Sequence, residues 1–381
     1  MTQKVLILGG QGRIGASVAS DVLAHTQATI TITGRQVASQ PALRQRSPRC
    51  EYLVLDLAHR EAVVQAIAHH SLVIHCAGPF SYRDRHVLET CIAQGVNYID
   101  VADNPGYVRE ALQLSEAAQA KGVTAIVGTG VFPGISNSLV RQGIEQLDEA
   151  DSVQLSYVVA GSGGAGVTVM RTTFLELQHP FLGWIDGAWH SVKPYSKREI
   201  VTFPAPYNRC GVYWFNTIEA MTLPVSFSLK TVITKFGSVP DWYNHLTWMM
   251  AHGLPKRWLR QPSTIEFLAQ ASYRMTEISD RFSGIGIAMR ADIDGHHNDT
   301  PVRQTATFLH ADTAAAAGMG TGSVAQFLLS GALKAPGVWP VEQAVPTGLF
   351  QQACQRRGLT SHFAADRQPQ QLVNQPMNHA S

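Results

Sequence analysis

The sequence is poor in charge, and neither sign of charge dominates. Charged residues make up 15% of the 381 residues, against roughly 25% in an average soluble domain. Thirty Lys and Arg face 28 Asp and Glu, so the formal net charge is only +2. Binding to a phosphate backbone requires a basic excess that is missing here. We therefore expect a lightly charged surface and no nucleic-acid partner.

Long apolar runs and cysteine motifs are also missing. No run approaches the roughly 18 to 20 apolar residues of a membrane span, and the chain starts with a strand pattern instead of an export leader. The five cysteines are widely spaced and form no CxxC pair, which predicts neither a disulfide framework nor a metal site. These features predict a soluble protein of the reducing cytoplasm.

Strands and helices alternate through the first third of the chain. Short apolar runs, separated by stretches with helical spacing, predict strands at residues 4–8, 29–33, 52–55, 71–76, 97–101 and 124–127. This alternation is typical of a parallel sheet with helices on both faces. We therefore predict an α/β protein with an N-terminal Rossmann fold, a doubly wound parallel sheet.

The pattern changes after Pro133 and Gly134. Later strand-like stretches are spaced too widely for regular βαβ units, which predicts a second, α+β domain inserted before a C-terminal return helix. That helix is expected near residues 322–333, because Pro336 and Gly337 follow it as stop signals. The predicted divisions are a Rossmann domain at 1–135, an α+β domain at 136–312, a return to the first domain at 313–358 and a flexible tail at 359–381.

A glycine-rich turn, GGQGRIG, follows the first strand and opens a helix. In this context backbone N–H groups and the helix N-terminus can bind a pyrophosphate. Gly10 permits the tight turn, Gly12 lets the backbone approach the phosphates, and Gly15 lets helix and sheet pack closely. For Arg13, a phosphate contact and a solvent-exposed cap of the turn are equally good accounts. The predicted cofactor-binding residues here are Gly9, Gly10, Gln11, Gly12, Arg13, Ile14 and Gly15.

The end of the second strand favours NADP(H) over NAD(H). NAD enzymes place an acid there to bind the ribose hydroxyls, but this chain has Gly34 and Arg35. A guanidinium offers charge-assisted hydrogen bonds to the 2′-phosphate of NADP, whereas a carboxylate would repel it. Asp56 follows the third strand, where it could reach the adenine edge or simply cap a helix.

Several segments together resemble the saccharopine dehydrogenase family. They are the glycine turn, HCAGPFSY at 75–82, GVNYIDVADN at 95–104, GTGVFPGISN at 128–137 and KAPGVWPVE at 334–342. The resemblance covers the first 140 residues well and residues 150–310 weakly. It implies an NAD(P)-dependent oxidoreductase, in many members acting on a C–N bond and in some on an enoyl double bond. It also implies a second domain whose sheet often builds a homodimer.

Carried over by position, the resemblance implies further cofactor contacts. Ala77, Gly78 and Pro79 would lie over the pyrophosphate and ribose. Phe80 would flank the nicotinamide, although a core aromatic is an equally good account of it. The turn with Gly130, Pro133, Gly134 and Asn137 would lie where the nicotinamide carboxamide and the substrate meet.

The catalytic candidates are Asp103, Tyr98 and Asn137. Tyr98 and Asp100 share one face of a strand, and Asp103 belongs to the loop at its end. Where family members continue into a Gly-Glu pair, this chain has residues 103–106, DNPG. Asp103 is the first candidate for an acid or base, with a turn-forming role beside Pro105 as the alternative.

The substrate candidates lie in the second domain. The glycine loop around Gly164 could bind a carboxylate through its N–H groups, and Arg171 could clamp it. An ordinary strand-to-helix connection explains the loop equally well. Tyr195 lies among several donors between Trp184 and Arg209.

The leading hypothesis is hydride transfer between NADP(H) and a C–N bond of an amino-acid or polyamine-like substrate. The alternatives are reduction of a C=C bond in an apolar or lipid-like molecule, and a sensor or assembly protein that binds NADP without turnover. A small-molecule substrate and a homodimer are the expected partners. The stretch from Trp242 to Leu259 could lie on a membrane surface, but burial in a core or dimer contact is favoured.

Overall fold

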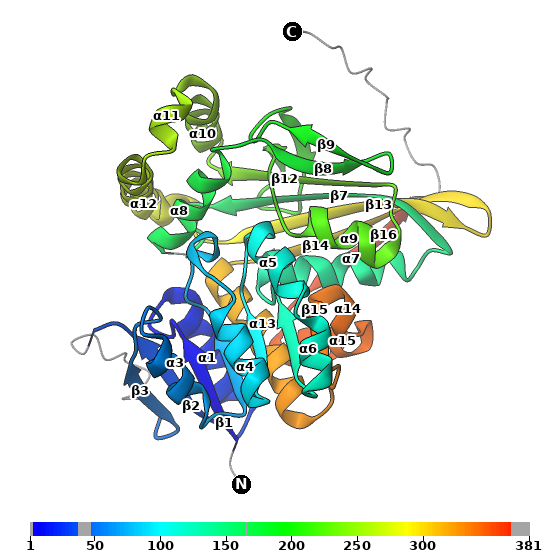
Figure 1. Cartoon of the computed structure of the whole chain (residues 1–381). Coiled ribbons are helices and arrows are strands. Elements are labelled where there is room, and N and C mark those ends of the chain that lie inside the picture. The colour runs from blue at the N-terminus through cyan, green and yellow to red at the C-terminus, as the bar shows by residue number, and fades with distance from the viewer. Residues whose placement is uncertain (1–2, 37–46, 165, 367–381) are drawn as a thin grey trace.

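The computed structural model describes residues 3–36, 47–164 and 166–366. Two sheets lie one above the other, with helices between them and on their outer sides (Figure 1). No described helix has both the length and the apolar character needed to cross a membrane.

The first sheet is parallel and has seven strands in the order β15-β6-β5-β4-β1-β2-β3. It confirms the predicted Rossmann architecture. The strands are β1 (Lys4–Leu8), β2 (Thr29–Gly34), β3 (Cys50–Val54), β4 (Leu72–His75), β5 (Asn97–Asp100), β6 (Thr124–Val127) and β15 (Gly337–Pro340).

Both faces of this sheet are buried, as the uninterrupted apolar runs require. Val5 and Ile7 of β1 point into one core, and Leu6 and Leu8 point into the other. The first core is covered by α1 (Arg13–His25), α13 (Thr313–Ser330), α14 (Val341–Ala344) and α15 (Thr347–Arg357). The second is covered by α3 (Arg60–Ile67), α4 (His86–Gln94), α5 (Pro105–Leu112) and α6 (Ser115–Ala120).

The C-terminal segment closes onto the first helix. A side chain at Gly318 of α13 would meet the backbone of Ser17 at 2.6 Å, so α1 and α13 pack at close range. Beyond α13, the buried guanidinium of Arg357 donates to both carboxylate oxygens of Asp21, with contacts of 2.6 Å and 2.9 Å. These contacts account for the return of the chain to the Rossmann fold.

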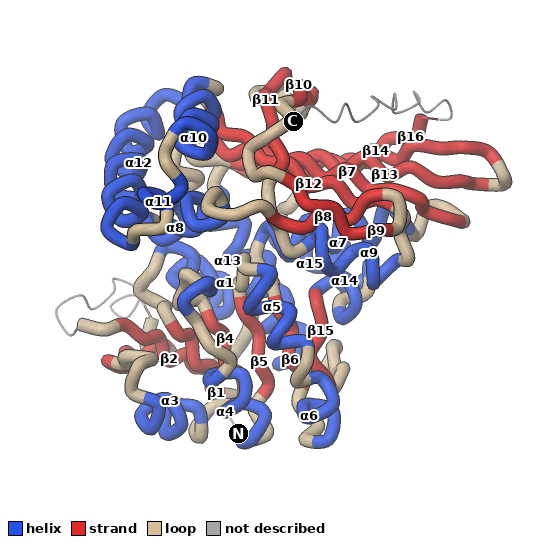
Figure 2. The backbone as a smooth tube through the Cα atoms, turned by 45° about the horizontal axis from the view of Figure 1, so that its top comes forward, coloured by secondary structure: helices blue, strands red, loops and turns tan. Residues whose placement is uncertain are grey.

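The second sheet is mixed and has nine strands. Its main path is β10-β11-β12-β7-β13-β14-β16, with β8 and β9 attached beside β12. The strands are β7 (Glu149–Ala160), β8 (Phe181–Ile185), β9 (Ala188–Val192), β10 (Glu199–Thr202), β11 (Arg209–Trp214), β12 (Thr231–Val239), β13 (Ile287–His297), β14 (Thr300–His310) and β16 (Ser361–Asp366). Figure 2 shows the long strands extending beyond the Rossmann half.

Strand β16 corrects part of the predicted tail. Residues 361–366 pair antiparallel with β14 from Phe308 to Arg303, because the outer edge of β14 offers free backbone groups to a returning segment. Residues 367–381 lie outside the described part of the chain, and the domain divisions otherwise stay a prediction.

The helices of the second half flank its sheet. They are α7 (Ser136–Ile144), α8 (Val167–Glu176), α9 (Glu219–Phe227), α10 (Trp242–Gly253), α11 (Lys256–Leu259) and α12 (Pro262–Ser283). Short turns η1 (Phe80–Tyr82) and η2 (Val131–Ile135) follow β4 and β6. Both turns lie beyond the carboxyl ends of parallel strands, where open α/β sheets bind ligands.

Candidate active site

The glycine turn has the geometry of a phosphate-binding loop. A side chain on Gly10 would meet Ile32 at 2.6 Å, so this position packs directly on the sheet. Gly12 is exposed, and a Cβ there would meet only the Gly9 carbonyl oxygen, at 3.3 Å. Gly12 is also the N-cap of α1 and supplies no side-chain cap. The helix N-terminus therefore keeps donors directed at an open surface, which suits a pyrophosphate.

Two guanidinium groups lie near the end of β2. Arg35 is exposed, and Arg83 is held by a 2.7 Å hydrogen bond from its Nε to the Ala77 carbonyl oxygen. The pKa of Arg83 is lowered, chiefly by burial and next by the charge of Arg35. The charges of Asp56 and Asp84 act on Arg83 in the opposite direction. Two neighbouring cations fit a bound phosphate. Asp56 is exposed, and its Oδ1 accepts a hydrogen bond from the Ala58 N–H at 3.0 Å.

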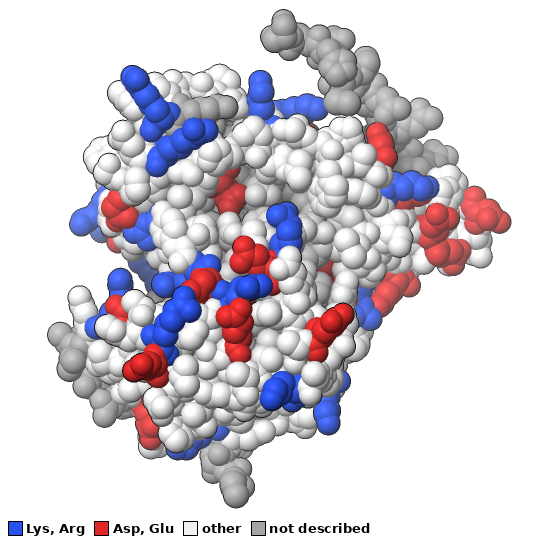
Figure 3. All heavy atoms as spheres, viewed as in Figure 1, with Lys and Arg blue, Asp and Glu red and all other residues white. Residues whose placement is uncertain are grey.

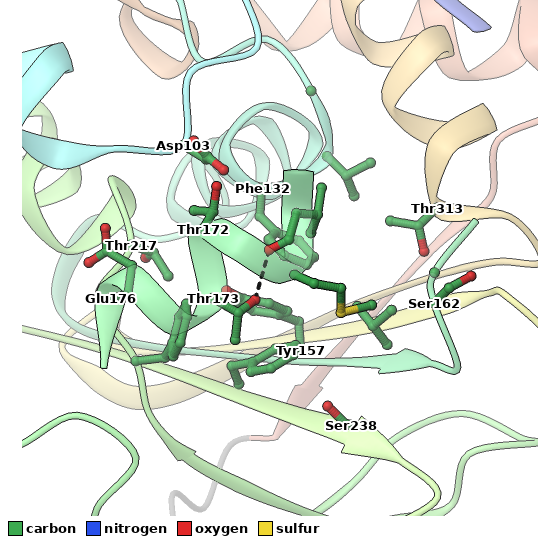
Figure 4. A pocket seen from close by; sticks show the side chains of 18 of the residues that line it. Asp103, Phe132, Tyr157, Ser162, Thr172, Thr173, Glu176, Thr217, Ser238 and Thr313 are labelled. Atoms are coloured by element: carbon green, nitrogen blue, oxygen red, sulfur yellow. Dashed lines mark hydrogen bonds between the residues drawn. The ribbon is translucent and has the colours of Figure 1, made fainter. Parts of the chain in front are cut away.

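A cavity of ≈ 220 Å³ lies between the two sheets. Ile14, Val101, Asp103 and residues 130–133 reach it from the carboxyl-end loops of the Rossmann sheet. The opposite wall comes from the second sheet and its helices, including Tyr157, Val159, Met170, Phe174, Phe215, Phe236, Ser238, Tyr243 and Thr247. Residues from both halves therefore enclose one space (Figure 4).

Asp103 extends from the loop after β5 into this cavity. Its Oδ1 is buried and has no hydrogen-bond partner among the described residues. Burial raises the pKa of Asp103 to about 6. Figure 4 shows the Thr172 hydroxyl beside it. A buried carboxyl with a free oxygen and a pKa near neutrality can donate or accept a proton.

Glu176, which the sequence analysis missed, is the second acid of the cavity. Its Oε1 accepts a hydrogen bond from Asn104 Nδ2 at 3.2 Å, and its Oε2 accepts one from Asn216 Nδ2 at 2.7 Å. Asn104 cannot turn away, because its Oδ1 caps α5 by accepting from the Tyr107 N–H at 3.0 Å. Burial, and then the charge of Asp103, raise the pKa of Glu176 to about 7.

The rest of the cavity is aromatic and hydroxyl-bearing. Described residues from the whole lining include Asp103 and Glu176 but no Lys, Arg or His. Figure 4 places Glu176 and Thr217 on the side of Asp103, with Ser162 and Thr313 on the other side. The arrangement can receive a molecule with an apolar body, and its acids have no cationic partner in the lining.

Four of the predicted site residues meet at this cavity. They are Ile14, Asp103, Gly130 and Pro133. Ala77, Gly78 and Pro79 follow β4 at the same end of the sheet, and a side chain on Gly78 would meet Thr168 of the second half at 3.6 Å. Their predicted contacts with the cofactor stay predictions.

Tyr98 and Asn137 do not reach the cavity. Tyr98 is fully buried in the Rossmann core, where its hydroxyl donates to Asp100 Oδ2 at 2.9 Å and lies 2.9 Å from the Tyr107 hydroxyl. Asn137 is buried, and its Oδ1 accepts from the Gly134 N–H at 2.9 Å. Both side chains hold the backbone in position, and their catalytic assignments stay predictions.

The three substrate candidates are also engaged elsewhere. Gly164 donates its N–H to Ser162 Oγ, 3.2 Å away. Arg171 pairs with Glu266 of α12 at 2.6 Å. Tyr195 is buried, and its hydroxyl donates to Asn244 Oδ1 at 2.6 Å. The glycine loop is thus the strand-to-helix connection that formed the alternative, and the predicted carboxylate clamp is not assembled.

Two predicted cofactor residues have structural partners. Phe80 is buried, with its ring 4.9 Å from that of His75 and 5.0 Å from that of Tyr107, as a core aromatic would be. Arg13 reaches across to the second half, where it donates to the Gly164 carbonyl oxygen at 3.2 Å and to the Tyr273 hydroxyl at 2.6 Å. Arg13 therefore connects the glycine turn to the opposite wall of the site.

The chain is similar, over part of its length, to known dehydrogenases and to a synthase. Residues 5–126 match the family model described as the saccharopine dehydrogenase NADP-binding domain. Carboxyaminopropylagmatine dehydrogenase of Synechocystis is 26% identical over 216 residues, which are 53% of this chain and 54% of that protein. Carboxynorspermidine synthase of Vibrio alginolyticus is 26% identical over 154 residues, 37% of this chain and 36% of the relative.

Two further comparisons concern a saccharopine dehydrogenase-like oxidoreductase and a solved saccharopine dehydrogenase. The human saccharopine dehydrogenase-like oxidoreductase is 29% identical over 132 residues, 34% of this chain and 30% of that protein. The aligned segments thus span from 30% to 54% of the length of these three relatives. The solved apo saccharopine dehydrogenase (L-Glu forming) of Saccharomyces cerevisiae superposes with a TM-score of 0.67 at 14% identity, covering 95% of this chain and 100% of that one. The chain therefore has the saccharopine dehydrogenase fold, and residues 5–126 match the NADP-binding domain of the saccharopine dehydrogenase family.

Proposed function

We propose that the protein is an NADP(H)-dependent oxidoreductase that acts on a C–N bond of an amino-acid or polyamine-like substrate. The main support for this proposal is the pair of buried carboxyl groups, Asp103 and Glu176, in a cavity whose described lining holds no basic side chain. An amine or imine nitrogen between them would lie beside a carboxylate that balances its positive charge and a carboxylic acid that can donate a proton. The polyamine-related names of two relatives support the same substrate class.

The chain's own residues would perform the positioning and the proton transfer. Bound NADPH supplies the hydride. In the reductive direction the substrate carbon gains the hydride, the C=N double bond becomes single, and the nitrogen takes a proton from Asp103 or Glu176. The amides of Asn104 and Asn216 hold Glu176 in place, and the aromatic walls keep water from the reacting bond.

The cofactor would lie along the carboxyl ends of the parallel strands. Gly12 and the N-terminus of α1 would hold the pyrophosphate, and Arg35 with Arg83 would hold the 2′-phosphate. The exposed backbone at Gly12 and the two neighbouring cations fit these groups. Ile14 and Gly130, which border the cavity, would adjoin the nicotinamide end.

A second candidate is reduction of a C=C bond in an apolar molecule. It is favoured by the aromatic and aliphatic walls formed by Phe132, Tyr157, Phe174 and Phe236, and by the missing carboxylate clamp. In this case Asp103, whose pKa burial raises to about 6, would deliver a proton to the carbon next to the one that gains the hydride.

NADPH oxidation in the presence of imine and enone panels tests these proposals. The imines would be formed from diamines or agmatine-like amines with aldehydes and keto acids, and the enones would be apolar. Turnover of imines that is lost in Asp103→Asn supports the C–N proposal, whereas turnover restricted to enones overturns it in favour of the second candidate. Tight NADPH binding with no turnover in either panel would indicate a sensor.

Cofactor preference is tested separately by fluorescence titration with NADPH and NADH. We expect a preference for NADPH that collapses in Arg35→Asp and weakens in Arg83→Gln. Arg356→Gln, an exposed arginine of α15, is the matched control and should leave both affinities unchanged. Equal affinities in the wild type would contradict the assignment of Arg35.

The proposal also includes a homodimer formed through the nine-stranded sheet, a cytoplasmic location and the domain divisions given above. Sedimentation measured over a range of protein concentrations tests the dimer.

A further inference from the structure

The helices α10, α11 and α12 carry an unusual number of exposed large apolar side chains. We call this the α10–α12 surface and define it by Trp242, Trp248, Met249, Trp258, Phe267, Met275, Ile278 and Phe282. Phe267 is 70% exposed and Phe282 is 89% exposed. Burial in the core of the chain is thus wrong for the three tryptophans between Trp242 and Leu259, although Tyr243 and Leu259 are buried. The other favoured expectation, a dimer contact, stays a prediction.

The exposed residues follow the period of each helix. On α10, Trp248 and Met249 lie six and seven residues after Trp242, about two helical turns along. The exposed His245 and His252 lie between and beyond them. On α12, Phe267, Met275, Ile278 and Phe282 form a similar stripe. The α12 stripe is separate from the helix's buried residues Ile265, Ala269 and Thr276. Each helix therefore has one apolar side toward the protein and another toward solvent.

Unpaired cations accompany these apolar residues. Arg257, Arg260, Arg274 and Arg281 are exposed, and no hydrogen bond or ion pair joins them to another described residue. The nearby acids Asp241 and Glu266 are already paired, with Arg198 and Arg171. Figure 3 shows Lys and Arg atoms among white atoms at the corner formed by α10 and α11.

We propose that the α10–α12 surface docks on an anionic lipid bilayer. Tryptophan rings favour the boundary between headgroups and acyl chains, and arginines beside them bind lipid phosphates. A large exposed apolar area with unpaired cations is otherwise costly on a soluble protein. The charge of the surface identifies the lipid as anionic.

A second copy of the chain fits this surface less well. A two-fold interface places the same patch against itself, so the four arginines would face a second set of four, with Glu277 of α12 as an exposed acid among them. An anionic membrane supplies the missing negative charge at every position.

Docking would leave the proposed active site accessible. Tyr243 and Thr247 of α10 and Ser272 and Thr276 of α12 line the cavity from within, while the apolar stripes of the same helices face outward. The helices that contact the bilayer are thus those that form one wall of the cavity. The inference does not depend on which bond the enzyme reduces.

Vesicle flotation of the full chain tests the proposal. We would compare vesicles of phosphatidylcholine alone with vesicles of phosphatidylcholine and phosphatidylglycerol in equal parts. The protein should float with the mixed vesicles, and added salt should weaken binding because it screens the attraction. Arg257→Gln with Arg260→Gln should lower the partition coefficient by about tenfold or more, since each arginine near an anionic surface contributes about fivefold.

The apolar contribution is tested by Trp248→Ser with Phe282→Ser, which should also lower partitioning by about tenfold or more. Matched controls are Arg356→Gln and Val225→Ser, which remove an exposed cation of α15 and an exposed apolar side chain of α9. Both should bind vesicles as the wild type does. Thermal unfolding and NADPH titration of every variant separate a binding defect from misfolding.

Two results would overturn the proposal. The first is the absence of flotation with mixed vesicles for a folded wild-type protein. The second is a concentration-dependent dimer that is lost in Trp248→Ser with Phe282→Ser, which would assign the surface to a second copy.

Discussion

Two pairs of buried acids lie where the Rossmann half meets the second half, and their surroundings differ. Asp103 and Glu176 border the cavity between the sheets. Glu219 and Glu342 are at most 1% exposed and are absent from the described lining of that cavity. Burial raises the pKa of all four carboxyl groups. A raised pKa therefore does not by itself distinguish a reactive acid from a structural one.

Access to the cavity, and not hydrogen bonding, separates the two pairs. Glu342 accepts from Asn137 Nδ2 at 2.8 Å and from Ser226 Oγ at 3.0 Å, so both of its oxygens are used inside the protein. Glu219 accepts from Ser136 Oγ at 2.6 Å. Glu219 Oε2 is buried without a hydrogen-bond partner among the described residues, as is Asp103 Oδ1, but only Asp103 borders the cavity. Glu342 joins α14 to α7 and α9, whereas Asp103 and Glu176 can act on a ligand.

The largest expected effect is on turnover. Asp103→Asn and Glu176→Gln keep the shape of each side chain but remove the titrating proton, so kcat should fall by about a hundredfold or more. Steady-state NADPH oxidation with a substrate found in the imine panel measures the change. Glu342→Gln is the matched control, since it neutralises a buried acid outside the cavity. An equal loss in Glu342→Gln would erase the distinction between the pairs.

The next effect is on stability. Glu342→Ala should lower the free energy of unfolding by about 2 to 4 kcal/mol, because it leaves a void and deprives Asn137 Nδ2 and Ser226 Oγ of their acceptor. Urea unfolding followed by circular dichroism gives the value. Glu342→Gln, which fills the same volume and still offers an acceptor, should cost less than about 1 kcal/mol. A small loss in the alanine variant would show that Glu342 does not hold the two halves together.

The cavity pair should affect stability in the opposite direction and only at higher pH. The folded pKa of Asp103 is raised to about 6 and that of Glu176 to about 7. Below the ordinary carboxyl pKa both states are protonated, and no stability is lost. As the pH rises through the folded values, the unfolded chain gains more from ionisation, so the wild type loses stability.

Asp103→Asn and Glu176→Gln remove this loss. Each variant should be more stable than the wild type by on the order of 1 to 2 kcal/mol at about pH 8, with no advantage near about pH 4. Thermal unfolding at both pH values measures the difference. Variants that are destabilised at the higher pH would indicate that the carboxylates are stabilised by a cation that the described lining does not contain.

The difference between local sequence and tertiary packing explains which parts of the site the sequence could predict. The glycine turn, the strands of the parallel sheet and Asp103 were predicted because each depends on a few neighbouring residues. Glu176 and Arg171 lie on one helix, α8, and only tertiary packing decides which of them faces the cavity. Arg171 turns to Glu266 of α12, and Glu176 turns inward.

Strands whose pairing partners are far away in the sequence could not be assigned to a sheet in advance. Strand β15 joins the parallel sheet beside β6 after an excursion of more than two hundred residues, and no local pattern marks β16 as the partner of β14. The directions of the Tyr98 and Asn137 side chains could not be predicted either, because the sequence does not show which face of a strand end or of a helix start points toward the cavity. Residues on the substrate side of the cavity could therefore be identified only in the structure, whereas the glycine turn could be identified from the local sequence.

The smallest effect is expected at Tyr98. Its hydroxyl lies 3.1 Å from His75 Nδ1 and donates to Asp100 Oδ2, which in turn accepts at its Oδ1 from the Ala102 and Gly128 N–H groups. Tyr98→Phe removes one member of this sealed network, so it should lower the free energy of unfolding by about 1 to 2 kcal/mol. Because the cavity is untouched, kcat should stay within about twofold of the wild type, and its pH profile should not move. Urea unfolding and steady-state kinetics on the same preparation separate the two quantities. A large fall in kcat with unchanged stability would return Tyr98 to the catalytic machinery and would show that a proton can pass from the core to the cavity.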